Sequence, residues 1–477
     1  MSAKYYLLII FVGIAVILAA GCTQPAIEKQ TVPETPGVTM TVPVTPLNGS
    51  DAVVSRKLDN YMIALTDAGR FSGLVLVARG NTVLLSKGYG IANYEFSVPN
   101  TPGTVLPIGS NTKQFTAAAI MKLQEQRKLN VTDMVTRYIP NATKWKDIRI
   151  YHLLNHTAGV QSDGAFSITD PTDLTLPETL ERITSLNLTF EPGSGYTYSN
   201  NGYIALSYII EQASGMSYED YLKKNLFLPL GMNSTGQDNA RNVFPNRASG
   251  YTTMDGNHIR YDLQNIHNSW GAGSIHSTTE DMFRWVRAFH TPGTILSPES
   301  TAAMVDNHYG IERGIVKNRT YNGHGGRNFG FTSYTLYYPE TDVSIMFLSN
   351  HDRTPMGTLP NELSAIVFGE PYSLPQKIDR KPVPLTAGTF AEYIGTYAPV
   401  WEKSWTITVY ADGNRLFYDS VMPGDRKVEL FYGGNDTFFV TPESNDTFIF
   451  TRNSSGKVDR LKMYTMEGVF DESEKVS

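Results

Sequence analysis

Three short clusters of polar residues in this chain have the residue types that acyl transfer requires. In chain order they are Ser110-Asn111-Thr112-Lys113, Tyr198-Ser199-Asn200 and His324-Gly325-Gly326. A serine hydroxyl is a poor nucleophile until a base lies beside it. If Ser110 begins a helix, Lys113 lies one turn further along the same face, within reach of the hydroxyl. The first cluster therefore predicts a serine nucleophile with a lysine as its partner in proton transfer.

The residues that follow Ser110 predict a buried helix, because apolar side chains recur there at helical spacing: Phe115, Ala118, Ala119, Met121 and Leu123. The N-terminus of such a helix favours negative charge and offers an N–H donor for an oxyanion hole. Taken alone, Ser110 is equally consistent with an ordinary N-cap serine. The same Ser-x-x-Lys spacing recurs at Ser454 and Lys457 in a polar Asn/Ser/Gly segment, and we interpret that copy as a turn.

The other two clusters are predicted to lie on a loop and beside a strand pair. Tyr198 stands between a Pro/Gly-rich turn and a helix-like segment at residues 203–213. A phenol relays protons only if a nearby cation lowers its pKa from about 10, and Lys113 is the expected cation. His324-Gly325-Gly326 precedes residues 331–338 and 343–348, which predict paired strands. The glycines should let the substrate backbone lie close to the strand edge. Alone, these clusters would fit a half-buried tyrosine and a hairpin beside a surface histidine.

Together and in this order, the clusters resemble the serine β-lactamase and penicillin-binding-protein superfamily, most closely its class C β-lactamase-related branch of esterases and D-amino-acid peptidases. The resemblance covers roughly residues 50 to 370. It implies an α+β fold, in which an antiparallel sheet is flanked by helices and joined by a mainly helical lobe. Further family-like stretches are Phe71-Ser72-Gly73, residues 107–116, Leu153-Leu154-Asn155-His156-Thr157-Ala158-Gly159, Pro229-Leu230-Gly231-Met232, and Gly271-Ala272-Gly273-Ser274 with Ser277-Thr278.

The resemblance also implies a role for each residue. Ser110 would be the acylated nucleophile, with Lys113 as its partner in proton transfer and Tyr198 as general base. Asn200 would orient the substrate amide or Lys113, and the backbone N–H groups of Ser110 and Arg327 would form the oxyanion hole. Which of Lys113 and Tyr198 takes the first proton is left open. His156 is interpreted as part of a structural turn.

One departure from the family bears on the substrate. β-Lactamases usually carry a lysine where His324 stands, and its charge helps to hold a substrate carboxylate. Histidine is mostly neutral at pH 7. We therefore expect esters or D-peptides, held beside His324, Gly325 and Gly326, to be better substrates than β-lactams, although Arg327 could supply a cation. The alternatives are β-lactamase or D-Ala-D-Ala carboxypeptidase activity, or a non-catalytic surface protein that binds penicillin or peptides.

Catalysis is favoured over a decayed binding site because Ser110, Lys113, Tyr198 and Asn200 are all present. The expected partner is a small-molecule or peptide substrate. The net charge of −6 gives no electrostatic reason for nucleic-acid binding. The histidines show no metal-ligand spacing, so neither a metal nor another cofactor is expected.

The N-terminus predicts export. An apolar run at residues 5–20 after Lys4 fits a signal peptide, and Leu18-Ala19-Ala20-Gly21-Cys22 resembles a lipoprotein processing site. Residues 1–22 would be this signal, and Cys22, the single cysteine, would carry lipid on the outer face of the cytoplasmic membrane. An uncleaved membrane anchor is the alternative. Residues 23–50 are rich in Thr and Pro and predict an extended linker.

Two folded units are expected after the linker. The catalytic domain is assigned to residues 51–372 and a Pro-containing hinge to residues 373–386. Residues 387–470 predict a small all-β barrel or meander, similar to the lipocalin-like tails of some β-lactamase-related proteins. Its expected strands are residues 405–409, 416–418, 428–432, 438–441, 448–451 and 461–464.

Overall fold

The computed structural model describes residues 47–162, 174–238, 243–254, 257–261, 265–377, 379–384, 390–399, 406–420, 427–440, 447–465 and 468–477. The predicted signal peptide with Cys22 and nearly all of the predicted linker lie outside these ranges. In the described part of the chain, no helix has both the length and the hydrophobicity needed to cross a membrane.

A six-stranded sheet forms the centre of the larger domain. Its strands are β1 (Gly73–Arg79), β2 (Thr82–Tyr89), β10 (Glu312–Val316), β11 (Arg319–Asn328), β12 (Phe331–Tyr338) and β13 (Val343–Ser349). They follow the order β10-β11-β12-β13-β1-β2, and each neighbouring pair is antiparallel. The two segments predicted to pair, β12 and β13, do so from Thr332 opposite Ser349 to Tyr338 opposite Val343. The predicted antiparallel sheet is therefore confirmed.

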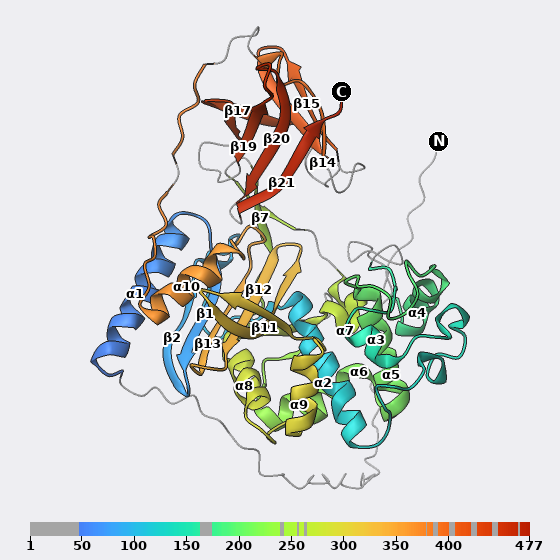
Figure 1. The fold of residues 1–477 in the computed structure, drawn as a ribbon. Coiled ribbons are helices and arrows are strands. Elements are labelled where there is room, and N and C mark those ends of the chain that lie inside the picture. The colour runs from blue at the N-terminus through green and yellow to red at the C-terminus, as the bar shows by residue number, and fades with distance from the viewer. Residues whose placement is uncertain are drawn as a thin grey trace, which may run out of the picture. The chain divides into compact units, whose positions relative to one another are not determined.

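Helices cover both faces of this sheet (Figure 1). Alternate residues of a strand point to opposite faces. Val75 and Val77 of β1 belong to the cluster formed with helices α1 (Gly49–Asp67) and α10 (Thr358–Phe368). Leu74 and Leu76 belong to the larger cluster, which extends into the helical lobe. Burial on both faces explains why β1 and β13 read as continuous apolar runs.

The helical lobe is inserted between β2 and β10. Its helices are α2 (Thr112–Glu125), α3 (Ile150–Leu154), α4 (Leu176–Ser185), α5 (Asn200–Ser214), α6 (Tyr218–Leu222), α7 (Trp270–Gly273), α8 (Thr279–His290) and α9 (Pro298–Asp306). Short strands lie between them: β3 (Ile91–Asn93), β4 (Val98–Pro99), β5 (Leu106–Pro107), β6 (Gly236–Gln237), β7 (Tyr251–Met254), β8 (Asn257–Arg260) and β9 (Ile275–Ser277). The expected architecture, an antiparallel sheet flanked by helices and joined by a mainly helical lobe, is present.

The C-terminal part of the chain forms a closed antiparallel barrel, which confirms the predicted all-β domain. Its strands are β14 (Gly395–Pro399), β15 (Ile407–Asp412), β16 (Arg415–Ser420), β17 (Val428–Gly434), β18 (Thr437–Phe439), β19 (Thr447–Arg452), β20 (Val458–Thr465) and β21 (Gly468–Lys475). The interior is filled by aromatic side chains, including those of Tyr393, Tyr397, Phe438, Phe448 and Phe450.

Two barrel strands were not expected from the sequence. β14 and β21 pair with each other and close the barrel. The predicted domain boundary at residue 470 falls inside β21, which continues to Lys475. Half of the residues of β21 are charged, and its sequence lacks the apolar alternation that marks a half-buried strand. Its pairing with β14 and β20, rather than its own composition, makes it a strand.

Candidate active site

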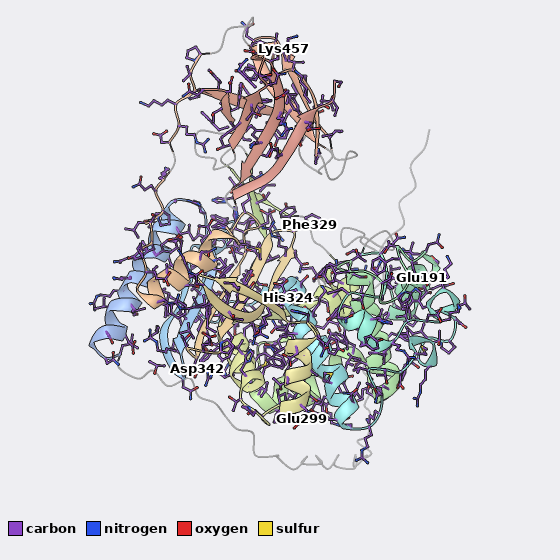
Figure 2. All side chains as sticks on the ribbon, viewed as in Figure 1. Glu191, Glu299, His324, Phe329, Asp342 and Lys457 are labelled. Atoms are coloured by element: carbon purple, nitrogen blue, oxygen red, sulfur yellow. The ribbon has the colours of Figure 1, made fainter. Side chains whose placement is uncertain are left out.

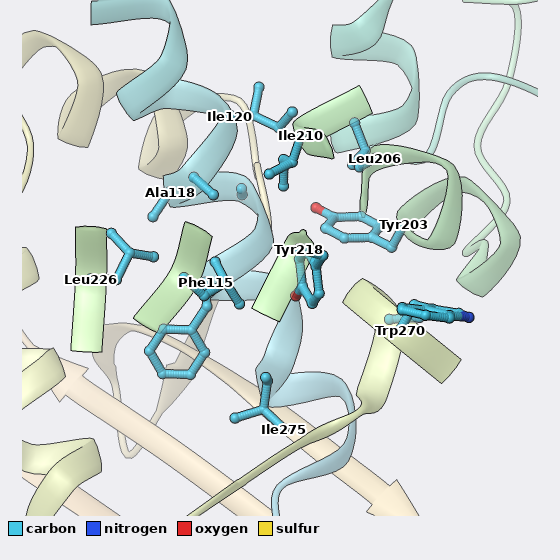
Figure 3. Packing of buried hydrophobic residues seen from close by; sticks show 14 of the residues in the cluster. Phe115, Ala118, Ile120, Tyr203, Leu206, Ile210, Tyr218, Leu226, Trp270 and Ile275 are labelled. Carbon is cyan, nitrogen blue, oxygen red and sulfur yellow. The ribbon is translucent and has the colours of Figure 1, made fainter. Parts of the chain in front are cut away.

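Helix α2 is fixed in the core of the helical lobe. Every residue from Thr112 to Met121 is buried, as the apolar spacing predicts. Figure 3 shows this packing, in which α2 residues lie among side chains from α5, α6 and α7: Phe115, Ala118, Ile120, Tyr203, Leu206, Ile210, Tyr218 and Trp270. A densely packed core gives α2 little freedom to shift. The turn that precedes it, and therefore Ser110, is held in one place.

A buried polar network joins the start of α2 to the sheet. Asn111 Nδ2 donates to Ser333 Oγ at 2.7 Å, and Ser333 Oγ donates to the Ile108 carbonyl at 2.6 Å. Gln114 Nε2 donates to Asn111 Oδ1 at 2.8 Å, and Trp285 Nε1 donates to Gln114 Oε1 at 3.2 Å. Buried hydrogen bonds of this kind are costly to break. The network therefore fixes Ser110, on the 3-10 turn Gly109–Asn111, relative to β12.

The side chain of Lys113 lies beside the hydroxyl of Ser110, as the spacing predicts. Its Nζ is 3.1 Å from Ser110 Oγ, 2.9 Å from Asn200 Oδ1 and 2.8 Å from the Ala272 carbonyl. Lys113 is completely buried. Burial lowers its pKa to about 7, and the charge of Glu312 offsets only part of that effect. A substantial part of the Lys113 side chains is therefore neutral near pH 7.

The three contacts determine what neutral Lys113 can do. The Asn200 Oδ1 and Ala272 carbonyl oxygens only accept hydrogen bonds, so they take two N–H groups of the amine. The remaining direction, toward Ser110 Oγ, is left for the lone pair. A neutral lysine held in this way can take the proton from Ser110. Asn200, the first residue of α5, thus contacts Lys113, which was one of its two expected partners.

Tyr198 lies close to Lys113, but its expected pKa shift is wrong. Lys113 Nζ is 4.7 Å from the centre of the Tyr198 ring. Burial raises the pKa of the phenol above its ordinary value, and a hydrogen bond with Ser110 offsets only part of this. The cation that was expected to lower it is weakened, because burial leaves Lys113 only partly charged at pH 7. Tyr198 is therefore a protonated donor rather than a phenolate in the resting site.

Close backbone contacts bring the start of α2 against β11. Gly109 has a φ of +52°, and a Cβ there would lie 2.8 Å from Arg327 N. A Cβ on Gly326 would lie 2.1 Å from the Ile108 carbonyl and 3.0 Å from Ser110 N. The two predicted oxyanion donors, Ser110 N–H and Arg327 N–H, thus belong to backbones that only glycines allow to approach. We expected Gly326 to make room for a substrate backbone, but it makes room for the chain's own backbone.

His324 lies inside β11, 4% exposed, where this strand faces the helices (Figure 2). Its Nδ1 is hydrogen-bonded to the Gly325 carbonyl, so Nδ1 carries the proton and Nε2 has the lone pair. Burial and the charge of Lys113 lower the pKa of His324 to about 4. The ring is therefore neutral at pH 7, as expected. Arg327 is exposed, and its Nε lies 3.1 Å from Met356 Sδ.

Two neighbours of the site were not recognised as such from the sequence. Glu312 lies on β10 opposite Gly323, and its Oε1 is 3.8 Å from His324 Nε2. The Ala272 carbonyl contacts Lys113 from α7. Glu312 has no motif around it, and a carbonyl carries no residue-type signal. Ala272 does stand in one of the family-like stretches, which was the available indication.

The second Ser-x-x-Lys copy is far from such an environment. Ser454 and Lys457 are both exposed in the turn between β19 and β20. The side chain of Asn453 accepts from the Ser455 and Lys457 N–H groups. The interpretation of this copy as a turn is confirmed.

No group of three or more His, Cys, Asp or Glu side chains in the described part of the chain is arranged to hold a metal ion.

A serine and a buried lysine at the start of a helix, facing a strand of an antiparallel sheet, define the class of the serine β-lactamases and penicillin-binding proteins. The sequence profile of the family described as Beta-lactamase matches residues 56–367. The chain belongs to this family. Penicillin-binding protein 4* of Bacillus subtilis (strain 168) is 28% identical over 417 residues, covering 81% of this chain and 91% of the relative.

Solved structures show the same fold at lower identity. The octameric penicillin-binding-protein homologue of Pyrococcus abyssi superposes with a TM-score of 0.60 at 23% identity, covering 88% of this chain and 99% of the other. The D-amino acid amidase of Ochrobactrum anthropi SV3, in complex with L-phenylalanine amide, superposes with a TM-score of 0.59 at 23% identity, covering 66% and 99%. These likenesses define the fold and leave the substrate open.

Proposed function

We propose that this protein is a serine hydrolase that forms an acyl-enzyme at Ser110 with esters or amides and passes the acyl group to water. The observation that carries the proposal is the buried Lys113 amine. It lies 3.1 Å from Ser110 Oγ, and two fixed acceptors occupy its other directions. Such an amine is a base poised near neutral pH.

The reaction follows from these contacts. Neutral Lys113 takes the hydroxyl proton while Ser110 Oγ bonds to the substrate carbonyl carbon. The resulting oxyanion lies between the N–H groups of Ser110 and Arg327. When the bond to the leaving group breaks, that group takes a proton from Tyr198 or from protonated Lys113. Water then adds to the acyl carbon, loses a proton to the same pair, and releases the acid and Ser110.

Neutral His324 supports esters and amides over β-lactams. A β-lactam presents a carboxylate, and a ring whose pKa is about 4 offers it no charge at pH 7. The relative's name, penicillin-binding protein, makes acylation by penicillin without fast turnover the second candidate. Both candidates form an acyl-enzyme at Ser110. They differ in whether that acyl-enzyme is hydrolysed quickly, as for esters and amides in the first candidate, or persists, as for penicillin in the second.

The test is hydrolysis by the purified full chain. Hydrolysis of phenyl butanoate and of a chromogenic cephalosporin is measured for the wild type and for Ser110→Ala. We expect ester turnover that disappears in Ser110→Ala, with little cephalosporin hydrolysis. Mass spectrometry of the cephalosporin-treated protein would reveal a stable acyl adduct on Ser110. The enzyme assignment would be refuted if these substrates and D-peptides gave no turnover and formed no adduct on Ser110.

We also propose export and lipid attachment at Cys22. Support comes from the apolar run at residues 5–20, the small residues before Cys22, and the Thr/Pro-rich segment that follows. Cells expressing the wild type should place the protein in the membrane fraction and label it with a fatty-acid analogue. Cys22→Ser should lose the label. A labelled Cys22→Ser protein, or an unlabelled wild type, would contradict the proposal.

A further inference from the structure

Glu312 and His324 present two hydrogen-bond acceptors to each other at the edge of the candidate site. Glu312 Oε1 is 3.8 Å from His324 Nε2. His324 Nδ1 carries the ring proton because its partner, the Gly325 carbonyl, can only accept. Nε2 therefore offers a lone pair toward a carboxylate that also accepts. A gap between two acceptors is complementary to a group with several N–H donors.

The surroundings fix both acceptors and leave the carboxylate side of the gap open to solvent. The backbone N–H of Gly325 hydrogen-bonds to the Glu312 carboxylate. His324 is 5% exposed in its side chain, whereas Glu312 is 47% exposed. Tyr196, which is 68% exposed, lies near enough for the charge of Glu312 to raise the pKa of its phenol, in addition to the larger effect of burial. An accessible carboxylate that accepts a hydrogen bond is a suitable partner for a cation.

A cation bound at this gap would lie in the same site as the Lys113 amine, which is only partly charged at pH 7. Burial raises the pKa of Glu312, and Lys113 offsets only part of this. A bound cation would stabilise the carboxylate, whereas a second carboxylate on the substrate would be repelled.

We propose that Glu312 and the Nε2 atom of His324 bind a primary ammonium group of the substrate, so that the enzyme selects amine-bearing esters and amides over carboxylate-bearing ones. This inference rests on the proposed hydrolase function and names the substrate class. The ammonium donates one N–H to the carboxylate and one to Nε2. No covalent step is involved, and the reacting carbonyl stays with Ser110.

Three phenyl esters of nearly equal size provide the test. The β-alanine ester carries an ammonium group, the butanoate ester a methyl group, and the hydrogen succinate ester a carboxylate. Rates for the full chain are corrected for spontaneous hydrolysis. We expect kcat/KM to be highest for the β-alanine ester and lowest for the succinate ester. Glu312→Gln should lower the β-alanine to butanoate ratio about tenfold or more, since a charge-assisted hydrogen bond is lost.

The matched control is Glu340→Gln, which removes the same charge from an exposed turn between β12 and β13. It should leave the substrate ratios unchanged. An N-trimethylated β-alanine ester keeps the charge but has no N–H donor, and it should lose most of the preference. A ratio unaffected by Glu312→Gln would overturn the proposal. So would an equal loss for all three esters, which would show that Glu312 acts through Lys113.

Binding separates this inference from the proposed function. In the Ser110→Ala protein, which cannot form the acyl-enzyme, the β-alanine ester should still bind more tightly than the butanoate ester. Adding Glu312→Gln should remove that difference. Butanoate turnover that depends on Ser110, without any amine preference, would refute the ammonium site alone. Absence of turnover together with an amine preference in binding would refute the hydrolase and retain the site.

Discussion

His156 holds the backbone on both sides of Tyr198. Its carbonyl accepts from the Thr197 N–H at 3.0 Å, and its Nδ1 accepts from the Ser199 N–H at 3.0 Å. The His156 ring lies 4.5 Å from the Tyr198 ring. Burial lowers the pKa of His156 to about 3, so Nδ1 keeps its lone pair at neutral pH. The residue interpreted as part of a structural turn is thus a positioning residue for the phenol.

This arrangement predicts that His156→Ala impairs catalysis more than His156→Asn. Alanine leaves the buried Ser199 N–H without its acceptor, which costs about 1–3 kcal/mol. It is also poorly suited to the φ of +61° at this position, which asparagine tolerates. An asparagine Oδ1 can replace Nδ1 as the acceptor. We expect kcat for phenyl butanoate to fall roughly ten- to hundredfold in His156→Ala. Equal activity of the two variants would contradict the positioning role, and melting temperatures control for unfolding.

The pKa of Lys113 predicts a pH profile with a single rising limb. Only the neutral amine accepts the Ser110 proton, so kcat/KM should increase as the pH rises through about 7 and then level off. His324 and His156, with pKa values of about 4 and about 3, stay neutral above pH 6 and add no limb. The pKa of Tyr198 is raised, so no fall is expected below pH 9. A bell-shaped profile centred near 7 would disagree with this assignment.

Glu312→Gln should move that limb. The charge of Glu312 raises the pKa of Lys113, so its removal should shift the midpoint to lower pH. The measurement is the pH dependence of butanoate ester hydrolysis by both proteins, with Glu340→Gln as the control. An unchanged midpoint would mean that the carboxylate is not charged in the working enzyme, and a shift toward higher pH would contradict the stated effect of Glu312 on Lys113.

Gly326→Ala should destabilise the fold by about 3 kcal/mol or more, because this Cβ would overlap backbone that cannot move without disturbing Ser110. Gly325→Ala is the matched control. There the nearest atoms are the side chains of Met356 and Tyr334 at 3.3 Å, which can adjust, so a cost below about 1 kcal/mol is expected. Urea denaturation gives both values. Equal costs would show that the strand and the turn before α2 separate easily.

The barrel depends on its aromatic interior. Phe438 is completely buried, and its ring lies 4.9 Å from Tyr393 and 5.3 Å from Phe450. Phe438→Ala should cost the barrel about 3–5 kcal/mol through the cavity it creates. Phe431→Ala, at a half-buried position, should cost less. Hydrogen exchange of the amides in β16 to β20 measures the loss, and similar protection in both variants would argue against a single aromatic core.

The sequence by itself determined the candidate catalytic residues and several of the elements. Ser110 and Lys113 meet because three residues along a helix make nearly one turn, and the apolar residues after them bury that helix. β13 was predictable because a strand between two helical layers is a nearly continuous apolar run, and β12 because it is rich in aromatic and β-branched residues. The polar turn around Ser454 was recognisable from its composition.

Tertiary structure decided how the site is charged and what lies beside it. Burial shifts a proton affinity by removing water, and burial depends on neighbours distant in sequence. Lys113 is therefore a base with a pKa of about 7, whereas the pKa of Tyr198 is raised instead of lowered. Glu312 reaches His324 through the pairing of β10 with β11, and β21 is a strand only because β14 and β20 flank it. Local sequence encodes spacing and periodicity, whereas only the folded chain determines desolvation and cross-strand partners.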